Sequence, residues 1–232
     1  MSNKYVDFVL DKDFLECVKW VCDAYPETSK EINMEELNRN TIDPFKIIFD
    51  MLNGGMDYDT WIENEAIRQH DKTINNRIGD FHQKLLGKVN GWTNLGTGDT
   101  TKVDLKKNDN SIFIELKNKE NTVNADSKDK VRDKLEKVIR TNPQAKAYWA
   151  YILSKKGDSG EKVWKYNNKQ DENIRIIWGE NVYQLITGKN DSLEKVWAAL
   201  PIAIKDVLNL NTDLSRDQKE KLMQLFSTSL RG

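Results

Sequence analysis

The stretch TKVDLKKNDNSIFIELKNKEN, residues 101–121, decides the fold that the sequence predicts. Its pattern predicts a β-hairpin with one strand at 102–107, a turn at 108–110 and a return strand at 111–118. Asn and Asp in the turn tolerate the positive φ that tight hairpin turns require. The run Ile112, Phe113 and Ile114 is typical of a buried strand, because β-branched and aromatic side chains fit a pleated surface.

Three polar side chains are expected to converge at the end of this hairpin. Glu115 and Lys117 are two residues apart and leave the same face, and Asp104 on the partner strand can face them. Two carboxylates this close repel each other unless a cation lies between them, and hard oxygen ligands with room for water suit Mg²⁺. A neighbouring lysine can steady or deprotonate an attacking water, so the pattern predicts phosphodiester hydrolysis. The alternative is a surface hairpin with ordinary salt bridges, since 31% of the residues are charged.

The composition indicates a folded globular protein. The chain has 232 residues, 38% of them hydrophobic, and seven tryptophans, which excludes a disordered protein. No run of about 18 apolar residues is present, so we expect no membrane span, and residues 1–8 do not resemble a signal peptide. Cys17 and Cys22 are the only cysteines and are expected to be reduced thiols. These features predict a cytoplasmic protein.

The charge is distributed unevenly along the chain. The net charge is −1, but residues 102–169 carry 17 Lys and Arg against 10 Asp and Glu, whereas residues 1–101 carry 11 against 18. A basic zone on the hairpin and on the segments after it is suited to holding the phosphates of double-stranded DNA. The alternative is a solvated helix with loops, because many of these lysines alternate with acids.

Two polar segments flank the hairpin. Residues 91–99 form a glycine-rich loop that is not a P-loop, since it lacks Gly-Lys-Ser/Thr. Residues 118–130, NKENTVNADSKDK, offer donors and acceptors to base edges. The candidate DNA-binding residues of the second segment are Asn118, Lys119, Asn121, Thr122, Asn124 and Lys128. The two histidines, His70 and His82, are expected to be packed or hydrogen-bonded residues and not metal ligands.

The remaining periodicity predicts an α/β fold with a mixed central sheet flanked by helices. Helices are expected at 11–25, 30–38 and from Pro44 to a break at Gly54 and Gly55, then at 73–86, ending at a left-handed Gly87. After the hairpin come a helix at 127–140, strands at 145–153, 162–166 and 174–178, and helices at 181–186, 193–208 (interrupted near Pro201) and 215–230. We expect one nuclease domain, 1–232, with a helical N-terminal part at 1–70, a catalytic core at 71–190 and C-terminal helices at 191–232.

Four segments resemble the type II restriction endonucleases that cut GGNCC sites, within the PD-(D/E)xK nuclease superfamily. They are DKTINNRIGDFHQKLLG at 71–87, Gly-Trp at 91–92, Val-Asp-Leu at 103–105 and IELKNKENT at 114–122, and the resemblance covers about residues 44–178. The usual proline is absent, because Val103 precedes Asp104. The resemblance implies that Asp104, Glu115 and the Leu116 carbonyl hold the metal, that Lys117 is catalytic and that Asp80 is an auxiliary carboxylate.

The resemblance also implies an activity and partners. The activity is Mg²⁺-dependent double-strand cutting of DNA at a short, palindromic, GC-rich site of the GGNCC type. The partners are a second copy of the chain in a homodimer and a DNA methyltransferase that protects host DNA. The alternatives are a structure-specific repair or junction nuclease on the same core, and a non-catalytic DNA-binding protein.

Overall fold

The computed structural model describes residues 3–25, 35, 37, 40–120, 125–167 and 170–230. The chain divides into two compact units, one of Met1–Lys19 with Gly79–Gly232 and one of Trp20–Ile78. The first unit contains the sheet and the second is helical. Within the described residues, no helix is both long enough and apolar enough to cross a membrane.

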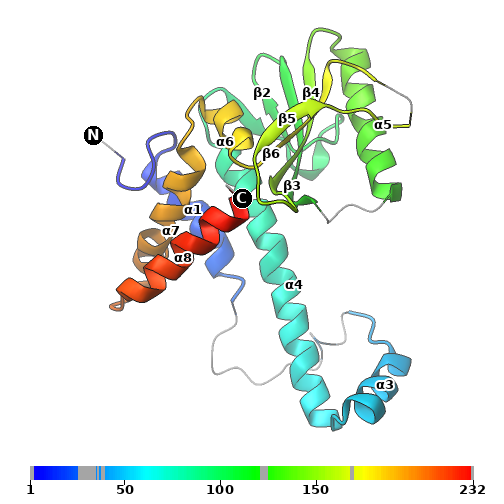
Figure 1. Ribbon diagram of the computed structural model, residues 1–232, viewed down its shortest axis with the longest axis vertical. Coiled ribbons are helices and arrows are strands. Elements are labelled where there is room, and N and C mark those ends of the chain that lie inside the picture. Colours follow the sequence, from blue (N-terminus) through cyan, green and yellow to red (C-terminus); the bar gives the residue numbers. More distant parts are fainter. Residues whose placement is uncertain are drawn as a thin grey trace. The chain divides into compact units, whose positions relative to one another are not determined.

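The first unit is built on a six-stranded sheet (Figure 1). In sheet order the strands are β1 (Trp92–Asn94), β2 (Leu105–Lys107), β3 (Ile112–Lys119), β4 (Lys146–Leu153), β6 (Ile174–Trp178) and β5 (Gly160–Val163). The β3–β4 and β4–β6 pairs are parallel, and the other neighbours are antiparallel. The predicted α/β fold with a mixed central sheet is therefore confirmed.

Helices cover both faces of this sheet, as Figure 1 shows for α5 (Ala125–Thr141) and α6 (Glu180–Thr187). A parallel β3–β4 pair needs a crossover, and α5 supplies it. Val131, Leu135 and Val138 of α5 share one apolar cluster with Phe113 and Trp149 of the sheet. The face with odd-numbered β3 residues, which also carries Glu115 and Lys117, is therefore the α5 face.

Buried aromatic residues continue the core outside that cluster. Phe14 of α1 (Asp11–Cys22) packs edge-on against Phe81, near the end of α4 (Tyr58–Gly87). The next residue, His82, makes a 2.7 Å hydrogen bond through Nδ1 with the hydroxyl of Tyr183 in α6. The expectation that His82 is a packed, hydrogen-bonded residue is confirmed, and burial lowers its pKa to about 4. Cys17 and Cys22 are free thiols, as predicted.

The predicted hairpin is confirmed, with Asn110 in the left-handed region at φ 55°, but its first strand begins at Leu105 and not at Lys102, which has a φ of 58°. Three other expectations are wrong. Gly87 does not have a positive φ; it is glycine because a Cβ there would lie 2.5 Å from the Cβ of Asn94. The expected loop at 91–99 contains β1 and a short 3-10 helix, Gly96–Gly98, since pairing with β2 orders it. The helix α7 (Ser192–Leu208) continues through Pro201. The last helix, α8, spans Arg216–Leu230.

The second unit consists of α3 (Pro44–Gly54), most of α4 and a described part of the segment before α3. Asp43 caps α3 by accepting from the Phe45 and Lys46 N–H groups, and Gly55 ends it at φ 65°. Most of the predicted helix at 30–38 lies outside the described residues. The helix predicted at 73–86 begins fifteen residues earlier, at Tyr58, and α4 is 30 residues long.

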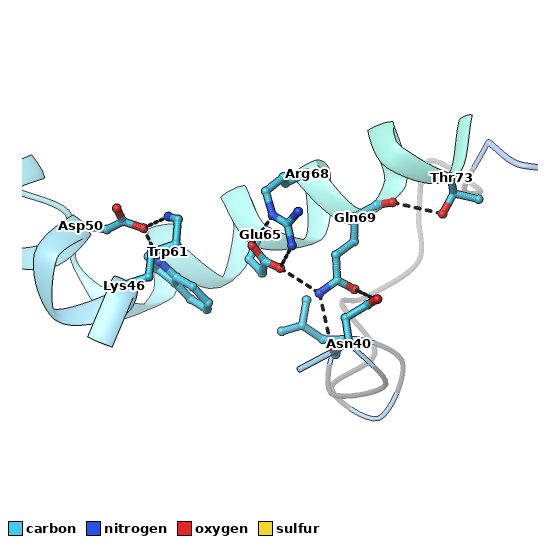
Figure 2. A network of polar contacts seen from close by, with 9 residues as sticks. Asn40, Lys46, Asp50, Trp61, Glu65, Arg68, Gln69 and Thr73 are labelled. Carbon is cyan, nitrogen blue, oxygen red and sulfur yellow. Dashed lines mark hydrogen bonds and ion pairs between the residues drawn. The ribbon is translucent and has the colours of Figure 1, made fainter. Parts of the chain in front are cut away.

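A polar network fixes this unit along α4 (Figure 2). The Trp61 indole donates to Asp50 of α3 at 2.9 Å, and Lys46 pairs with the same carboxylate. Further along α4, the buried Glu65 accepts from Arg68 and from Gln69. Gln69 in turn accepts from Asn40 at 2.7 Å. These bonds attach α3 and the chain before it to α4.

The predicted apolar stripe of α3 faces away from this unit's own core. The core cluster is Leu37, Trp61 and Ile62, and α3 contributes Ile47 to it. The stripe itself stays exposed: Phe45 is 74%, Ile48 55%, Phe49 71% and Leu52 82% accessible. We call these four residues the α3 apolar row.

Candidate active site

The hairpin holds Asp104 by its backbone and its side chain. The Asp104 N–H donates to the Ile114 carbonyl at 3.0 Å, and the Asp104 carbonyl accepts from the Leu95 N–H at 2.9 Å. The carboxylate oxygen Oδ2 accepts from the Leu116 N–H at 2.7 Å. The position of this carboxylate is therefore set by the strand that carries the other candidate residues.

Glu115 and Lys117 leave β3 beside Asp104. The Glu115 side chain is only 3% exposed, and Lys117 Nζ lies 2.8 Å from its Oε1. The same Nζ lies 4.0 Å from Asp104 Oδ2. The structure thus brings the three residues singled out from the sequence to one point, with the ammonium between the two carboxylates. Their roles in a reaction stay predictions.

The surroundings of Asp104 change the proton affinity of its carboxylate. Burial, together with the neighbouring charge of Glu115, raises the pKa of Asp104 to about 6. Burial acts to lower the pKa of Lys117, but the charges of Glu115 and Asp104 outweigh it, and the net shift is upward. Lys117 is therefore a charged ammonium near neutral pH, and a further cation would stabilise the ionised form of Asp104.

The donor set fits a hard divalent cation that keeps several waters. Asp104 and Glu115 supply two carboxylates, and the described residues contain no group of three or more His, Cys, Asp or Glu side chains that could hold a metal. A site with two carboxylates leaves coordination positions for water and a substrate oxygen, as Mg²⁺ prefers. The Leu116 carbonyl, the third predicted ligand, accepts a long 3.4 Å hydrogen bond from the Gln83 side-chain amide.

A fourth residue, Lys134 of α5, belongs to the same cluster and was not predicted. Its Nζ lies 2.7 Å from Glu115 Oε2, so each oxygen of Glu115 contacts a different ammonium. The sequence contains a signal for it: Lys134 lies one position before Leu135 of the buried α5 stripe, at the edge of the helix that faces the sheet. Of the residues of this helix, only Lys128 was singled out from the sequence, as a candidate DNA contact.

Asp80, the predicted auxiliary carboxylate, lies on the part of α4 that approaches β3. A Cβ on the preceding residue, Gly79, would be 3.9 Å from the Cβ of Asn118, and Gln83 contacts Leu116. No hydrogen bond or ion pair joins Asp80 to Asp104, Glu115 or Lys117, all of which the structure describes. The auxiliary role stays a prediction.

The predicted DNA-binding residues fall into three groups. Asn121, Thr122 and Asn124 lie outside the described residues. Lys119 is exposed and shares a face of β3 with Lys117, whereas Asn118 leaves the opposite face. Lys128 of α5 lies over the ring of Trp149, 5.8 Å from its centroid. Of the described candidates, Lys119 and Lys128 thus lie on the α5 face with the carboxylates.

A mixed sheet with a helix on each face, and a hairpin that presents two carboxylates and a lysine, defines a nuclease core of the PD-(D/E)xK type. The sequence model of the Eco47II restriction endonuclease family matches residues 6–209, and the chain belongs to this family. It is 31% identical to the type II restriction enzyme Sau96I of Staphylococcus aureus, over 98% of this chain and 88% of that enzyme. It is 34% identical to the type II restriction enzyme Eco47II of Escherichia coli, over 88% of each chain.

The family membership confirms the function predicted from the hairpin. The protein is a type II restriction endonuclease, a site-specific deoxyribonuclease that acts on DNA. Enzymes of this class generally use divalent metal ions, which agrees with the donor set of the site.

Proposed function

We propose that the chain cuts both strands of DNA with Mg²⁺ at the Asp104–Glu115–Lys117 cluster. The proposal is supported above all by the position of Lys117 Nζ, which lies 2.8 Å from Glu115 Oε1 and 4.0 Å from Asp104 Oδ2. Asp104, Glu115 and the Leu116 carbonyl are the proposed metal ligands. A surface salt bridge would not need two converging carboxylates at a buried position.

The reaction is hydrolysis of a phosphodiester. A bound divalent ion supplies positive charge to the phosphate and acidifies water. Lys117, an ammonium near neutral pH, orients the attacking water by donating a hydrogen bond to it. The water oxygen bonds to phosphorus in line and releases a proton to solvent, the bond from phosphorus to the 3′ oxygen breaks, and a proton from solvent completes the 3′-hydroxyl. The products carry a 5′-phosphate and a 3′-hydroxyl.

We propose Mg²⁺ as the ion because the two carboxylates leave room for its tightly held waters. Asp80 is the candidate auxiliary carboxylate, since Gln83 on the next turn of α4 already reaches Leu116. Its contribution would be visible as a loss of cleavage in Asp80→Asn, and unchanged cleavage in that variant would remove Asp80 from the site.

The proposed recognition sequence is palindromic, GC-rich and of the GGNCC type, as the sequence resemblance implies. Asn118, Lys119, Asn121, Thr122, Asn124 and Lys128 are the proposed DNA contacts. The excess of Lys and Arg at 102–169 supports phosphate binding around the cluster. Asn and Lys side chains offer hydrogen bonds to the major-groove edges of A and G respectively.

We propose a homodimer, because one hydrolytic site cuts one strand and a two-fold symmetric sequence presents two equivalent scissile bonds. The α3 apolar row supports self-association, since monomeric proteins rarely expose a contiguous apolar patch of this kind. A DNA methyltransferase of the same specificity is the proposed second partner.

The proposed compartment is the cytoplasm, because it contains the DNA on which both enzymes act. We also propose that residues 1–232 form one nuclease domain, with a helical part at 1–70, a catalytic core at 71–190 and C-terminal helices at 191–232.

A plasmid digest tests this proposal. Wild-type protein with Mg²⁺ is expected to give discrete fragments whose sequenced ends share one short site, and Glu115→Gln and Lys117→Met are expected to give none. Lys107→Met, in the same hairpin but away from the cluster, is the matched control and should cut. Cuts at branched DNA without a common sequence would favour a structure-specific nuclease. Undiminished cutting by both site variants would contradict the assignment of the site.

A further inference from the structure

The side chain of Glu115 is clamped by two lysines from different elements. Lys117 from β3 binds Oε1 at 2.8 Å, and Lys134 from α5 binds Oε2 at 2.7 Å. Glu115 is 3% exposed and Lys134 is 25% exposed, so the second contact is largely protected from water. One ammonium would satisfy an ordinary ion pair with this carboxylate, and the second calls for a separate explanation.

The packing of α5 fixes Lys134 in this place. Val131, Leu135 and Val138 attach the helix to the sheet, and Lys134 lies beside this stripe. Two other enclosed cations of the helix contact other groups. The half-buried Lys128 lies over the ring of Trp149, and the buried Arg132 donates to the Trp164 carbonyl at 2.7 Å and pairs with Glu136. Lys134 is thus held by the helix and directed at the candidate metal ligand.

The charges of the cluster show what Lys134 adds. Asp104 and Glu115 balance Lys117 and Lys134, so the metal-free cluster is neutral. Without Lys134 it would carry a charge of about −1, which attracts a divalent cation more strongly. With Lys134 present, the cluster with a bound metal is more positive, and it matches the negative charge that develops on the phosphate oxygens during attack.

We propose that Lys134 is a positioning residue of the hydrolytic site. It holds Glu115 through Oε2, lowers the affinity of the site for metal and speeds the attack of water on the phosphate. The inference rests on the proposed role of Glu115 as a metal ligand. It predicts opposite effects on two properties: removing the ammonium tightens metal binding and slows cleavage. A purely structural ion pair would weaken both when it is broken, because a misplaced Glu115 is a poorer ligand.

The test measures both properties in Lys134→Met, with Lys134→Arg as the conservative variant and Lys137→Met, an exposed lysine on the next turn of α5, as the control. Binding of Mn²⁺ to the DNA-free protein is measured by calorimetry, and cleavage by single-turnover kinetics at saturating metal. Lys134→Met is expected to bind Mn²⁺ about tenfold more tightly and to cut about 10- to 100-fold more slowly. Lys134→Arg and Lys137→Met should stay within about twofold of wild type on both measures.

Three results would overturn the proposal. They are weaker Mn²⁺ binding in Lys134→Met, unchanged binding, and unchanged cleavage. Lys134→Gln, which keeps a hydrogen-bond donor, replaces Lys134→Met if the latter does not fold. Glu115→Gln tests the location of the hydrolytic site separately from the role of Lys134. If this variant still binds Mn²⁺ and cuts DNA, the site itself is misassigned. If it does neither while Lys134→Met behaves as wild type, only the role of Lys134 falls.

Discussion

The Leu116 backbone N–H donates to the Asp104 carboxylate at 2.7 Å, across the two sides of the hairpin. Leu116 lies between Glu115 and Lys117, so this one bond ties the first carboxylate to the strand that carries the other two groups. Only Oδ2 of Asp104 takes part in this hydrogen bond, so Oδ1 can contact a metal ion. The hairpin is therefore the element that sets the mutual positions of the groups in the cluster, independently of DNA.

Asp104→Asn should abolish cleavage and stabilise the metal-free protein. Burial and the charge of Glu115 raise the pKa of Asp104 to about 6, so above pH 6 its ionised form lowers the free energy of unfolding. An uncharged Asn still accepts from Leu116, and we expect a gain of about 1 kcal/mol at pH 8. Denaturant unfolding with a chelator measures it.

The control for this variant is Asp109→Asn in the hairpin turn. Hydrogen bonds from Ser111 lower the pKa of Asp109 to about 2, so its ionised form is favoured in the folded protein. Asp109→Asn should therefore give no increase in stability. A decrease in stability for Asp104→Asn would contradict the account of its environment.

His82 should make the free energy of unfolding fall as the pH is lowered below about 6.5. Burial lowers its pKa to about 4 in the folded protein, so between these values the unfolded chain binds more protons than the folded one. The contribution is present above pH 6.5 and is lost progressively towards pH 4, with a slope of at most about 1.4 kcal/mol per pH unit. His82→Gln should unfold with a shallower pH dependence over this range, and an unchanged slope would contradict it.

Gly87→Ala should destabilise the protein because β1 runs against the end of α4. The added Cβ would lie 2.5 Å from Asn94 Cβ and 2.8 Å from Asn94 N, and backbone must move to admit it. We expect a cost of roughly 1–3 kcal/mol in the free energy of unfolding. Gly98→Ala is the control, since apart from the neighbouring residues in the chain no atom lies within 4 Å of its Cβ position. Equal unfolding midpoints for the two variants would contradict this packing.

Charged substitutions in the α3 apolar row should dissociate the proposed homodimer. Phe49 and Leu52 are 71% and 82% exposed, so Phe49→Asp with Leu52→Asp costs the folded chain little. Sedimentation should show a monomer for this variant and a dimer for wild type. Ile202→Asp with Leu208→Asp, at exposed apolar positions of α7, is the matched control and should remain dimeric. A dimeric α3 variant would place the contact elsewhere.

Local sequence was sufficient for the hairpin and for its three polar residues. Turn chemistry at Asn110 and the two-residue alternation of Glu115 and Lys117 depend on neighbours in the chain, so they can be predicted. The strand β1 could not be predicted from local sequence, because its three residues are ordered by pairing with β2, with Trp92 opposite Lys107. Its flanking glycines are more typical of a loop.

Features that depend on packing between distant segments were missed. Lys134 is 19 residues from Glu115 and reaches it only because α5 crosses back over the sheet. Gly87 has the sequence signature of a helix end, but the close approach of Asn94 determines its identity. The exposure of the α3 apolar row could not be predicted either, because apolar residues at this helical spacing are typical of a face that is buried.

The most direct test of the hydrolytic site is the location of the metal. Crystals of the protein soaked in Mn²⁺ and measured at the manganese edge should show an anomalous peak in contact with carboxylate oxygens of both Asp104 and Glu115. The peak should be absent in Glu115→Gln. A peak bound elsewhere, with none between these two carboxylates at concentrations that support cleavage, would contradict the account.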